Sequence, residues 1–333
     1  MTQTLTSDML EKLALERCIP VWVEPKWRTF GYIERQDRKR RYWSGNTLDL
    51  NTGGSTLISG DKDYASRVLR DGGLPVPEGK AFGSKEWCSQ INSEEGLDAA
   101  LQFGTLLGYP LFVKPNSSQG GRHVFRVTGQ DDLSASLLTI FREDKLALVQ
   151  KEVKGLDVRV LILDGEAVLA YERKPLTIVG DGKNKIRELL FMKIETLLKS
   201  GRKVRIEEEE MRIAFHLATT GISNFETVPD FGKEVILLPS ANLSTGGTSR
   251  SVIKELHHGY KALASRAASL LNLRYAGVDI ISPRFWDENP EGEAMVIEVN
   301  GRAPGVTQFF MNGDDERFEV ESLYRKILEA LLA

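Results

Sequence analysis

Three oxygen-bearing side chains on two neighbouring apolar segments are the clearest candidates for chemistry. Asp279 lies in the segment YAGVDII, among small and apolar residues, and Glu298 and Asn300 alternate in the next segment, IEVN. Alternating residues of a strand point to one face, so pairing the two strands would place all three groups on one surface. Magnesium takes hard oxygen ligands and shares them with substrate phosphates. The trio therefore predicts a magnesium–nucleotide site.

A structural role is the alternative for these acids. A carboxylate between Val278 and Ile280 is costly to bury unless a cation or another partner compensates it. A single acid of this kind is most simply a satisfied structural group or part of a capped turn. Three such groups on adjacent apolar strands favour the metal site.

A lysine followed by small residues is the second candidate. Lys114 ends the apolar segment LFVK, and PNSSQGGR follows it. The lysine supplies a point charge and the loop supplies open backbone N–H groups, which together suit a polyphosphate. The lysine precedes its loop, so this is not a Walker A motif. A solvated connection remains the alternative.

Two further segments could bind nucleotide or substrate. Residues 150–159 (QKEVKGLDVR) leave an apolar strand and could offer backbone groups to an adenine edge, with Asp157 near ribose and Arg159 near phosphate. Taken alone, this segment is a strand end with alternating charges. Residues 242–250 (NLSTGGTSR) form a hydroxyl-rich loop that ends in Arg250 and could bind a carboxylate or a phosphoryl group. An ordinary mobile loop is the alternative.

Hairpins and helices must position these candidates. Helices are predicted by apolar periodicity over residues 8–17 (with Ser7 as N-cap), 61–70, 94–107, 131–141, 185–199, 207–220, 254–272 and 318–332. Strands are predicted over residues 19–23, 30–33, 40–43, 111–114, 123–127, 146–150, 158–163, 166–171, 234–238, 276–282 and 293–299. Asp164-Gly165 is a strong hairpin turn. This mixture predicts an α+β fold and not a doubly wound parallel sheet.

Composition bounds the class of protein. With 333 residues, 41% hydrophobic, 27% charged and a net charge of −3, the chain suits a globular enzyme without a field that draws it to nucleic acid or acidic membranes. Two cysteines make no disulfide framework, and no apolar run approaches a membrane span, so a cytoplasmic location is expected. The basic run at 35–41 lacks interleaved aromatic residues, and the histidines and cysteines lack zinc-ligand spacing.

In their order and spacing, these motifs resemble the ATP-grasp superfamily, and most closely the ATP-grasp module of cyanophycin synthetase and of bifunctional glutathione-forming ligases. The likeness covers nearly the whole chain. The matching stretches are Asp61-Lys62, residues 73–79 (GLPVPEG), the V-K-P strand with its loop at 112–122, the hinge with G-x-D-x-R at 150–159, residues 171–175 (YERKP) with 180–182 (GDG), the N-L-S-T-G-G loop at 242–247, and the metal strands.

The resemblance implies roles for individual residues. It assigns metal binding to Asp279, Glu298 and Asn300. It assigns nucleotide binding to Lys62, Lys114, Ser117, Ser118, Gly120, Gly121, Gln150, Lys151, Val153 and Asp157. It assigns binding of an acyl phosphate or substrate carboxylate to Arg159, Arg173 and Arg302, and Arg250 joins these candidates from the hydroxyl-rich loop. The stretch NGRAPG has one residue more than the usual E-V-N-x-x-P-G pattern, and Arg302 is inserted where substrate binds.

The predicted architecture is an ATP-grasp fold with two α/β subdomains that clasp ATP. Its expected parts are a short N-terminal segment (1–58), an N-terminal subdomain (59–150) and a C-terminal subdomain with the metal site (151–333). The segment before Asp61 is shorter than a full preceding α/β domain, so substrate recognition is expected to be simplified or supplied by a partner.

The expected function is formation of an amide bond between a carboxylate and an amine, through an acyl phosphate, with release of ADP and phosphate. ATP and two Mg²⁺ ions, with Mn²⁺ as a substitute, are the expected cofactors. The expected partners are small molecules, with no nucleic acid and no membrane, and a homodimer is left open. The alternative is a catalytically reduced ATP-grasp module that binds nucleotide for regulation.

Overall fold

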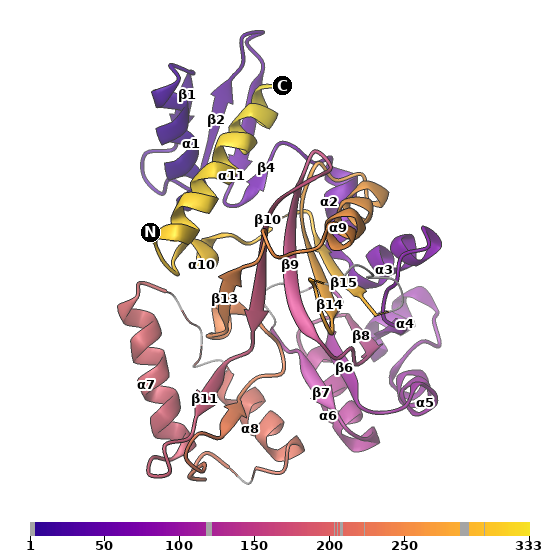
Figure 1. The fold of residues 1–333 in the computed structure, drawn as a ribbon. Coiled ribbons are helices and arrows are strands. Elements are labelled where there is room, and N and C mark those ends of the chain that lie inside the picture. Colours follow the sequence, from indigo (N-terminus) through magenta and orange to yellow (C-terminus); the bar gives the residue numbers. More distant parts are fainter. Residues whose placement is uncertain are drawn as a thin grey trace.

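The chain folds into antiparallel sheets covered by helices, as a computed structural model shows (Figure 1). The structure describes residues 4–117, 122–202, 204, 206, 209–222, 224–286, 293–302 and 304–333. In this part of the chain every strand pairing is antiparallel, and the helices lie against the faces of the sheets. The α+β prediction therefore agrees with the architecture.

The N-terminal segment forms a small sheet that shares its core with the C-terminal helix. Its elements are α1 (Leu5–Glu16), β1 (Val21–Val23), β2 (Phe30–Glu34), β3 (Arg40–Ser44) and β4 (Thr47–Leu48), with α11 (Asp314–Leu332) beside them (Figure 1). Apolar side chains of α1, the sheet and α11 form one cluster. The predicted cap at Ser7 is wrong: the helix begins at Leu5, and the Ser7 hydroxyl, inside it, accepts a 2.8 Å hydrogen bond from Trp43 Nε1.

A second sheet has the order β5-β8-β6-β7 and carries Lys114. Its strands are β5 (Gly79–Gly83), β6 (Leu111–Pro115), β7 (Phe125–Val127) and β8 (Leu146–Lys151), and its helices are α4 (Lys85–Ile91), α5 (Leu97–Leu107) and α6 (Gln130–Phe141). Leu111 and Val113 point into the apolar core with the helices. Strand alternation turns Lys114 to the opposite face.

The central sheet has the order β13-β10-β9-β14-β15. Its strands are β9 (Leu156–Leu163), β10 (Glu166–Lys174), β13 (Thr248–Ser251), β14 (Tyr275–Ser282) and β15 (Met295–Asn300). Asp164 and Gly165 join β9 to β10 with positive φ angles of 49° and 85°, which confirms the predicted hairpin turn. Helix α9 (His258–Leu270) starts four residues later than predicted, because the His257 side chain caps it by accepting from the Gly259 N–H.

Alternation along the central strands separates a core face from a site face. Val158, Val160 and Ile162 pack into the cluster that includes α9. On the other face of β9, Leu161 and Leu163 belong to the cluster shared with α11, whereas Arg159 is charged. The candidate site therefore lies on this second face, at the end of β9 where Arg159 takes the place of apolar residues.

Two of the remaining strands form a two-stranded sheet of their own, and the other elements connect the sheets. The remaining elements are α2 (Gly53–Gly60), α3 (Lys62–Asp71), β11 (Thr177–Val179), α7 (Ile186–Lys199), α8 (Glu210–Thr219), β12 (Glu234–Ile236), a 3-10 turn (Leu243–Thr245) and α10 (Thr307–Phe310). No helix in the described ranges combines the length and apolar character needed to cross a membrane. The division at residues 58 and 150 stays a prediction.

Candidate active site

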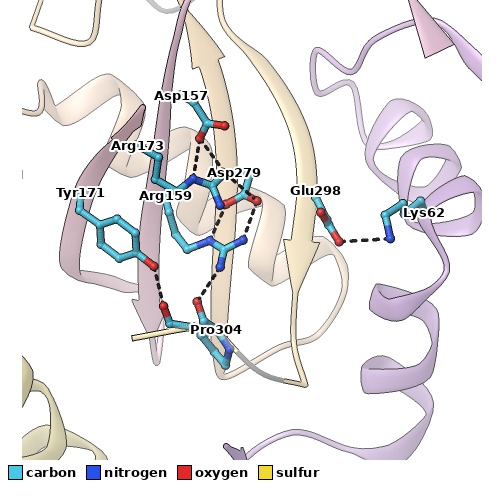
Figure 2. A network of polar contacts seen from close by, with 9 residues as sticks. Lys62, Asp157, Arg159, Tyr171, Arg173, Asp279, Glu298 and Pro304 are labelled. Carbon is cyan, nitrogen blue, oxygen red and sulfur yellow. Dashed lines mark hydrogen bonds and ion pairs between the residues drawn. The ribbon is translucent and has the colours of Figure 1, made fainter. Parts of the chain in front are cut away.

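Asp279 lies at the centre of a buried ion-pair network on the site face of the central sheet (Figure 2). The antiparallel register places it directly opposite Arg159 of β9. Arg159 donates from Nε to Oδ1 at 2.6 Å and from Nη2 to Oδ2 at 2.7 Å, and Arg173 Nη2 lies 3.1 Å from Oδ2. Burial alone would raise the pKa of Asp279, but the two guanidinium groups outweigh it and lower that pKa.

Asp157 completes the network at the neighbouring strand. It lies opposite Arg173, and its Oδ1 accepts from Arg173 Nε at 2.8 Å and from Nη2 at 2.6 Å. Burial raises the pKa of Asp157, Arg173 opposes this effect, and the negative charge of Asp279 adds to it. Both described bonds of this carboxylate use Oδ1, so Oδ2 is the oxygen available for a ligand hydroxyl.

Glu298 points away from this network toward the N-terminus of α3 (Figure 2). It lies directly opposite Asp279 in the β14–β15 ladder, and its Oε1 is 3.4 Å from Lys62 Nζ. Asn300, two residues on, shares its face, and its buried Nδ2 atom has no hydrogen-bond partner among the described residues. A small pocket is lined by Ser59, Gly60, Lys62, Glu298, Asn300, Gly301 and Arg302.

Lys114 faces the same charges from the second sheet. Burial lowers its pKa to about 8, Glu298 and Asp279 act in the opposite direction, and Lys62 adds to the lowering. Two buried lysines and an orphaned amide donor thus lie around Glu298. An anion with several oxygens could accept hydrogen bonds from both lysines and the amide.

The end of β6 positions the start of α3. Asp61 caps the helix by accepting from the Tyr64 N–H at 2.9 Å. Asn116, which is 1% exposed, accepts the Lys62 N–H with its backbone oxygen at 3.1 Å and the Asp63 N–H with its side-chain oxygen at 3.0 Å. The two lysine-bearing segments are therefore fixed to each other.

The expected adenine hinge leaves β8 at the edge of the same region. Gln150 is buried, Lys151 is exposed and Val153 is half-buried in the connection to β9. Among the described residues, no backbone hydrogen bond to another segment involves residues 152–154. Their backbone groups are thus open to an adenine edge.

The loop at residues 242–247 is a compact turn organised by its first residue. The Asn242 side chain accepts from the Ser244 N–H at 3.0 Å and hydroxyl at 3.1 Å, and its backbone oxygen accepts from Thr245 and Gly247. Buried Arg202 donates to the carbonyls of Leu243 at 2.6 Å and Gly247 at 2.7 Å. The hydroxyls of Ser244 and Thr245 are thus engaged within the turn.

Two of the four predicted arginines lie away from the network. Arg250 lies opposite Glu172, which places it on the other face of the sheet from Arg173, and it pairs there with Glu172 at 2.7 Å and Glu255 at 2.8 Å. Arg302 is exposed at the pocket of Glu298. Ser117 is exposed, whereas Ser118, Gly120 and Gly121 lie outside the described residues.

Sequence reasoning assigned no role to two residues of this site. Tyr171 donates its hydroxyl to the Gly305 carbonyl at 2.7 Å, and burial raises the pKa of this phenol. Its spacing of two from Arg173 on one strand was the available signal. Asn116 lay in the quoted loop motif, but its docking on α3 is a tertiary contact.

The donor set suits magnesium in part. Glu298 and Asn300 present oxygen-bearing groups beside two lysines, as a metal–phosphate site requires, and amide orientation is interchangeable at Asn300. Both oxygens of Asp279 are held by guanidinium groups, so Asp279 could ligate a metal only after an exchange of partners. Within the described ranges, no group of three or more His, Cys, Asp or Glu side chains could hold a metal.

Comparison with protein families gives one match over more than half of the chain. A family model described as the D-ala D-ala ligase C-terminus matches residues 68–261. Cyanophycin synthetase of Trichormus variabilis is 30% identical over 310 residues, which are 90% of this chain and 32% of that protein. The glutathione biosynthesis bifunctional protein GshAB of Streptococcus thermophilus is 29% identical over 89% of this chain and 39% of that protein. The chain thus spans about a third of the length of these relatives.

Among solved structures, a bifunctional glutathione synthetase from Pasteurella multocida aligns with a TM-score of 0.58. The alignment covers 97% of this chain and 44% of that chain at 24% identity. Together with the family match, this likeness confirms the fold that the sequence motifs predicted.

Proposed function

Because this chain belongs to the family of D-alanine–D-alanine ligase C-terminal domains, which have the ATP-grasp fold, we propose that it is an ADP-forming ligase. It joins a substrate carboxylate to an amine in an amide bond, through an acyl phosphate. The substrates are amino acids or small peptides, which agrees with the ligases of amino acids and peptides among its relatives.

The observation that carries this proposal is the convergence of Lys62, Lys114 and Glu298. Lys62 and Glu298, from elements distant in sequence, line one pocket with Asn300, and buried Lys114 of the second sheet interacts electrostatically with Lys62 and Glu298. A polyphosphate with its cation matches this arrangement, because its oxygens can accept from both lysines and its cation can bind carboxylate and amide oxygens.

Each part of the site has one task in this mechanism. Lys62 and Lys114 hold the phosphates, residues 150–153 contact adenine, and Asp157 accepts from ribose. Glu298 and Asn300, with Asp279 after it exchanges its arginine partners, would hold Mg²⁺, which would supply positive charge to the phosphoryl oxygens. Arg159 and Arg173 orient the substrate carboxylate and stabilise the oxyanion formed when the amine attacks. Closure of the two subdomains excludes water from the acyl phosphate.

A matrix of amino-acid pairs, screened for ADP formation with products identified by mass, tests this function. The expected result is ADP release that needs both an acid and an amine and yields a product whose mass is that of the pair less one water. If no pair of amino acids or dipeptides raises ADP release above the ATP-only rate, the ligase proposal fails.

One feature favours the second candidate, a nucleotide-binding regulatory module. Both oxygens of Asp279 are held by arginines, as in a site where that residue has lost its metal. Such a module would bind the non-hydrolysable ATP analogue AMP-PCP with Mg²⁺ and release no substrate-dependent ADP. The same screen therefore separates the two functions. The cytoplasmic location and the oligomeric state stay predictions.

A further inference from the structure

We propose that Asn51, in the N-terminal segment, is a positioning residue for the two strands and the loop that carry the candidate metal and substrate groups. Nothing in the sequence motifs marks this residue. The expected effect of Asn51 on catalysis rests on the proposed function, whereas its expected effect on the order of the two strands does not.

Asn51 joins the start of β14 to the end of β15. Its Nδ2 donates to the carbonyls of Tyr275 and Gly301, each at 2.7 Å. Its Oδ1 accepts from the N–H groups of Arg274 at 2.9 Å and Tyr275 at 3.0 Å. An asparagine side chain has two donors and two acceptor positions, so all four are used.

These contacts lie close to the site along both strands. Tyr275 is four residues before Asp279, and Gly301 follows Asn300 directly. Gly301 is held on its other side by Ser59, whose Oγ accepts the Gly301 N–H at 3.3 Å. A Cβ at Gly301 would lie 2.7 Å from that oxygen and 2.7 Å from Leu273, so the chain has little room to shift here.

The loop after β15 is held by its carbonyl groups. Thr47 Oγ1 donates to the Arg302 carbonyl at 3.0 Å, Arg159 Nη1 to Pro304 at 3.1 Å, and the Tyr171 hydroxyl to Gly305 at 2.7 Å. With the Gly301 bond from Asn51, these four carbonyls all point to protein donors. The N-terminal segment supplies two of the four donors, which couples it to the site.

An uncharged amide suits this junction better than a carboxylate. An aspartate would keep the acceptors for Arg274 and Tyr275 but would lose both donors and place its charge against two carbonyl oxygens. Asn51→Ala removes all four bonds. We therefore expect the ends of β14 and β15 to loosen together in either variant.

Three variants test the inference in the full chain. Asn51→Ala removes the junction, and Thr47→Val removes only the hydroxyl that holds Arg302. Ser7→Ala is the matched control, because it deletes another buried hydrogen bond of the N-terminal segment, to Trp43, and this bond involves none of the four carbonyl groups named above. Each variant is compared with the wild type by thermal unfolding, amide hydrogen exchange, binding of Mg²⁺ with AMP-PCP, and ADP formation with the pair found in the screen.

We expect amides of residues 295–302 to exchange at least about tenfold faster in Asn51→Ala and to keep the wild-type rate in Ser7→Ala. We expect kcat to fall at least about tenfold in Asn51→Ala, with KM for ATP changed less than about threefold, since misplaced groups cost more in the transition state than in binding. If Asn51→Ala does not fold, Thr47→Val tests the inference in its place. We expect this variant to show a smaller loss of kcat and faster amide exchange near residue 302.

Two results would overturn the inference. One is that the amides of residues 295–302 in folded Asn51→Ala, or of residue 302 in Thr47→Val, exchange at the wild-type rate. The other is an equal loss of kcat in Asn51→Ala and Ser7→Ala at equal loss of stability, which would make Asn51 a general support of the fold. A wild type that forms no ADP with any pair would refute the ligase function, and the exchange comparison would still decide the role of Asn51.

Discussion

Arg159 and Asp279 lie directly opposite each other on β9 and β14 and form a two-point ion pair, with N–O distances of 2.6 and 2.7 Å. The same pairing register places Glu298 opposite Asp279 on its other side. The two acids nevertheless differ in their partners, since Asp279 is held by arginines and Glu298 faces Lys62. Neutralising Asp279 and neutralising Glu298 should therefore have different effects on stability.

Asp279→Asn and Glu298→Gln should both abolish ADP formation but differ in stability. Each removes a ligand of the expected metal, and we expect kcat to fall at least about 100-fold, as loss of several kcal/mol of charge stabilisation implies. Asp279→Asn also removes the carboxylate that pairs with buried Arg159 and leaves Arg173 with Asp157 alone, which costs about 3–5 kcal/mol. Glu298→Gln breaks a single, longer contact of 3.4 Å in which the carboxylate is 24% exposed, and it should cost less than Asp279→Asn.

Steady-state kinetics and urea unfolding measure these two effects separately. Wild-type ADP release in both variants would refute the metal assignment. Equal losses of stability in the two variants would contradict the structure, in which Asp279 pairs with arginines and Glu298 with Lys62.

Lys62→Ala and Lys114→Met should weaken nucleotide binding. Each lysine contributes a charge-assisted contact worth about 1.5–3 kcal/mol, so we expect Kd for AMP-PCP with Mg²⁺ to rise about 10- to 100-fold. Calorimetric titration measures this change. Lys199→Ala, on an exposed helix end, is the control and should bind like the wild type. Unchanged affinity in both site variants would remove the phosphate assignment.

Substitutions of Arg173 and Arg250 should differ in their effect on kcat, since the two side chains lie on opposite faces of the sheet. Arg173→Lys loses the two-bond contact with Asp157 and the contact with Asp279, so we expect kcat to fall about tenfold or more. Arg250→Gln removes a half-exposed side chain from the opposite face, and kcat should stay within about twofold. The comparison is a kcat measurement at saturating substrates. An equal fall in both variants would place Arg250 in the catalytic machinery.

His216 should make stability depend on pH. Burial, with Arg126 and Arg212 nearby, lowers its pKa from 6.5 to about 4. Between these values the unfolded chain binds more protons than the folded one, so this stabilisation is complete above about pH 6.5 and is lost as pH falls toward 4. His216→Gln should flatten the unfolding free energy in this window, by on the order of 1–3 kcal/mol.

Urea unfolding from pH 4 to pH 7 provides this test. His258→Gln, at an exposed position, is the matched control and should keep the wild-type profile. A wild-type profile in His216→Gln would show that other groups cause the pH dependence.

Local pattern was sufficient for the strand pair that carries the candidate metal residues. The alternation of Glu298 and Asn300 and the apolar neighbours of Asp279 predicted the shared face, and the register confirms it. The Asp164-Gly165 turn could also be predicted, because the positive φ angles of a two-residue hairpin turn depend on the residue types in the turn itself. The short strands β5, β11 and β13 were missed, because each is defined by its pairing with a distant strand and not by its own periodicity.

The sequence by itself determined the fold family, the strand that holds Lys114 and the residues that could meet phosphate and metal, since these depend on residue type and short-range spacing. Tertiary structure alone decided the partners. It held Asp279 between two arginines, turned Glu298 to Lys62, placed Arg250 on the opposite face and brought Asn51 to the ends of β14 and β15. The physical reason is that a buried charge or amide takes its partner from whichever segment packs against it, and that choice is made by the whole fold.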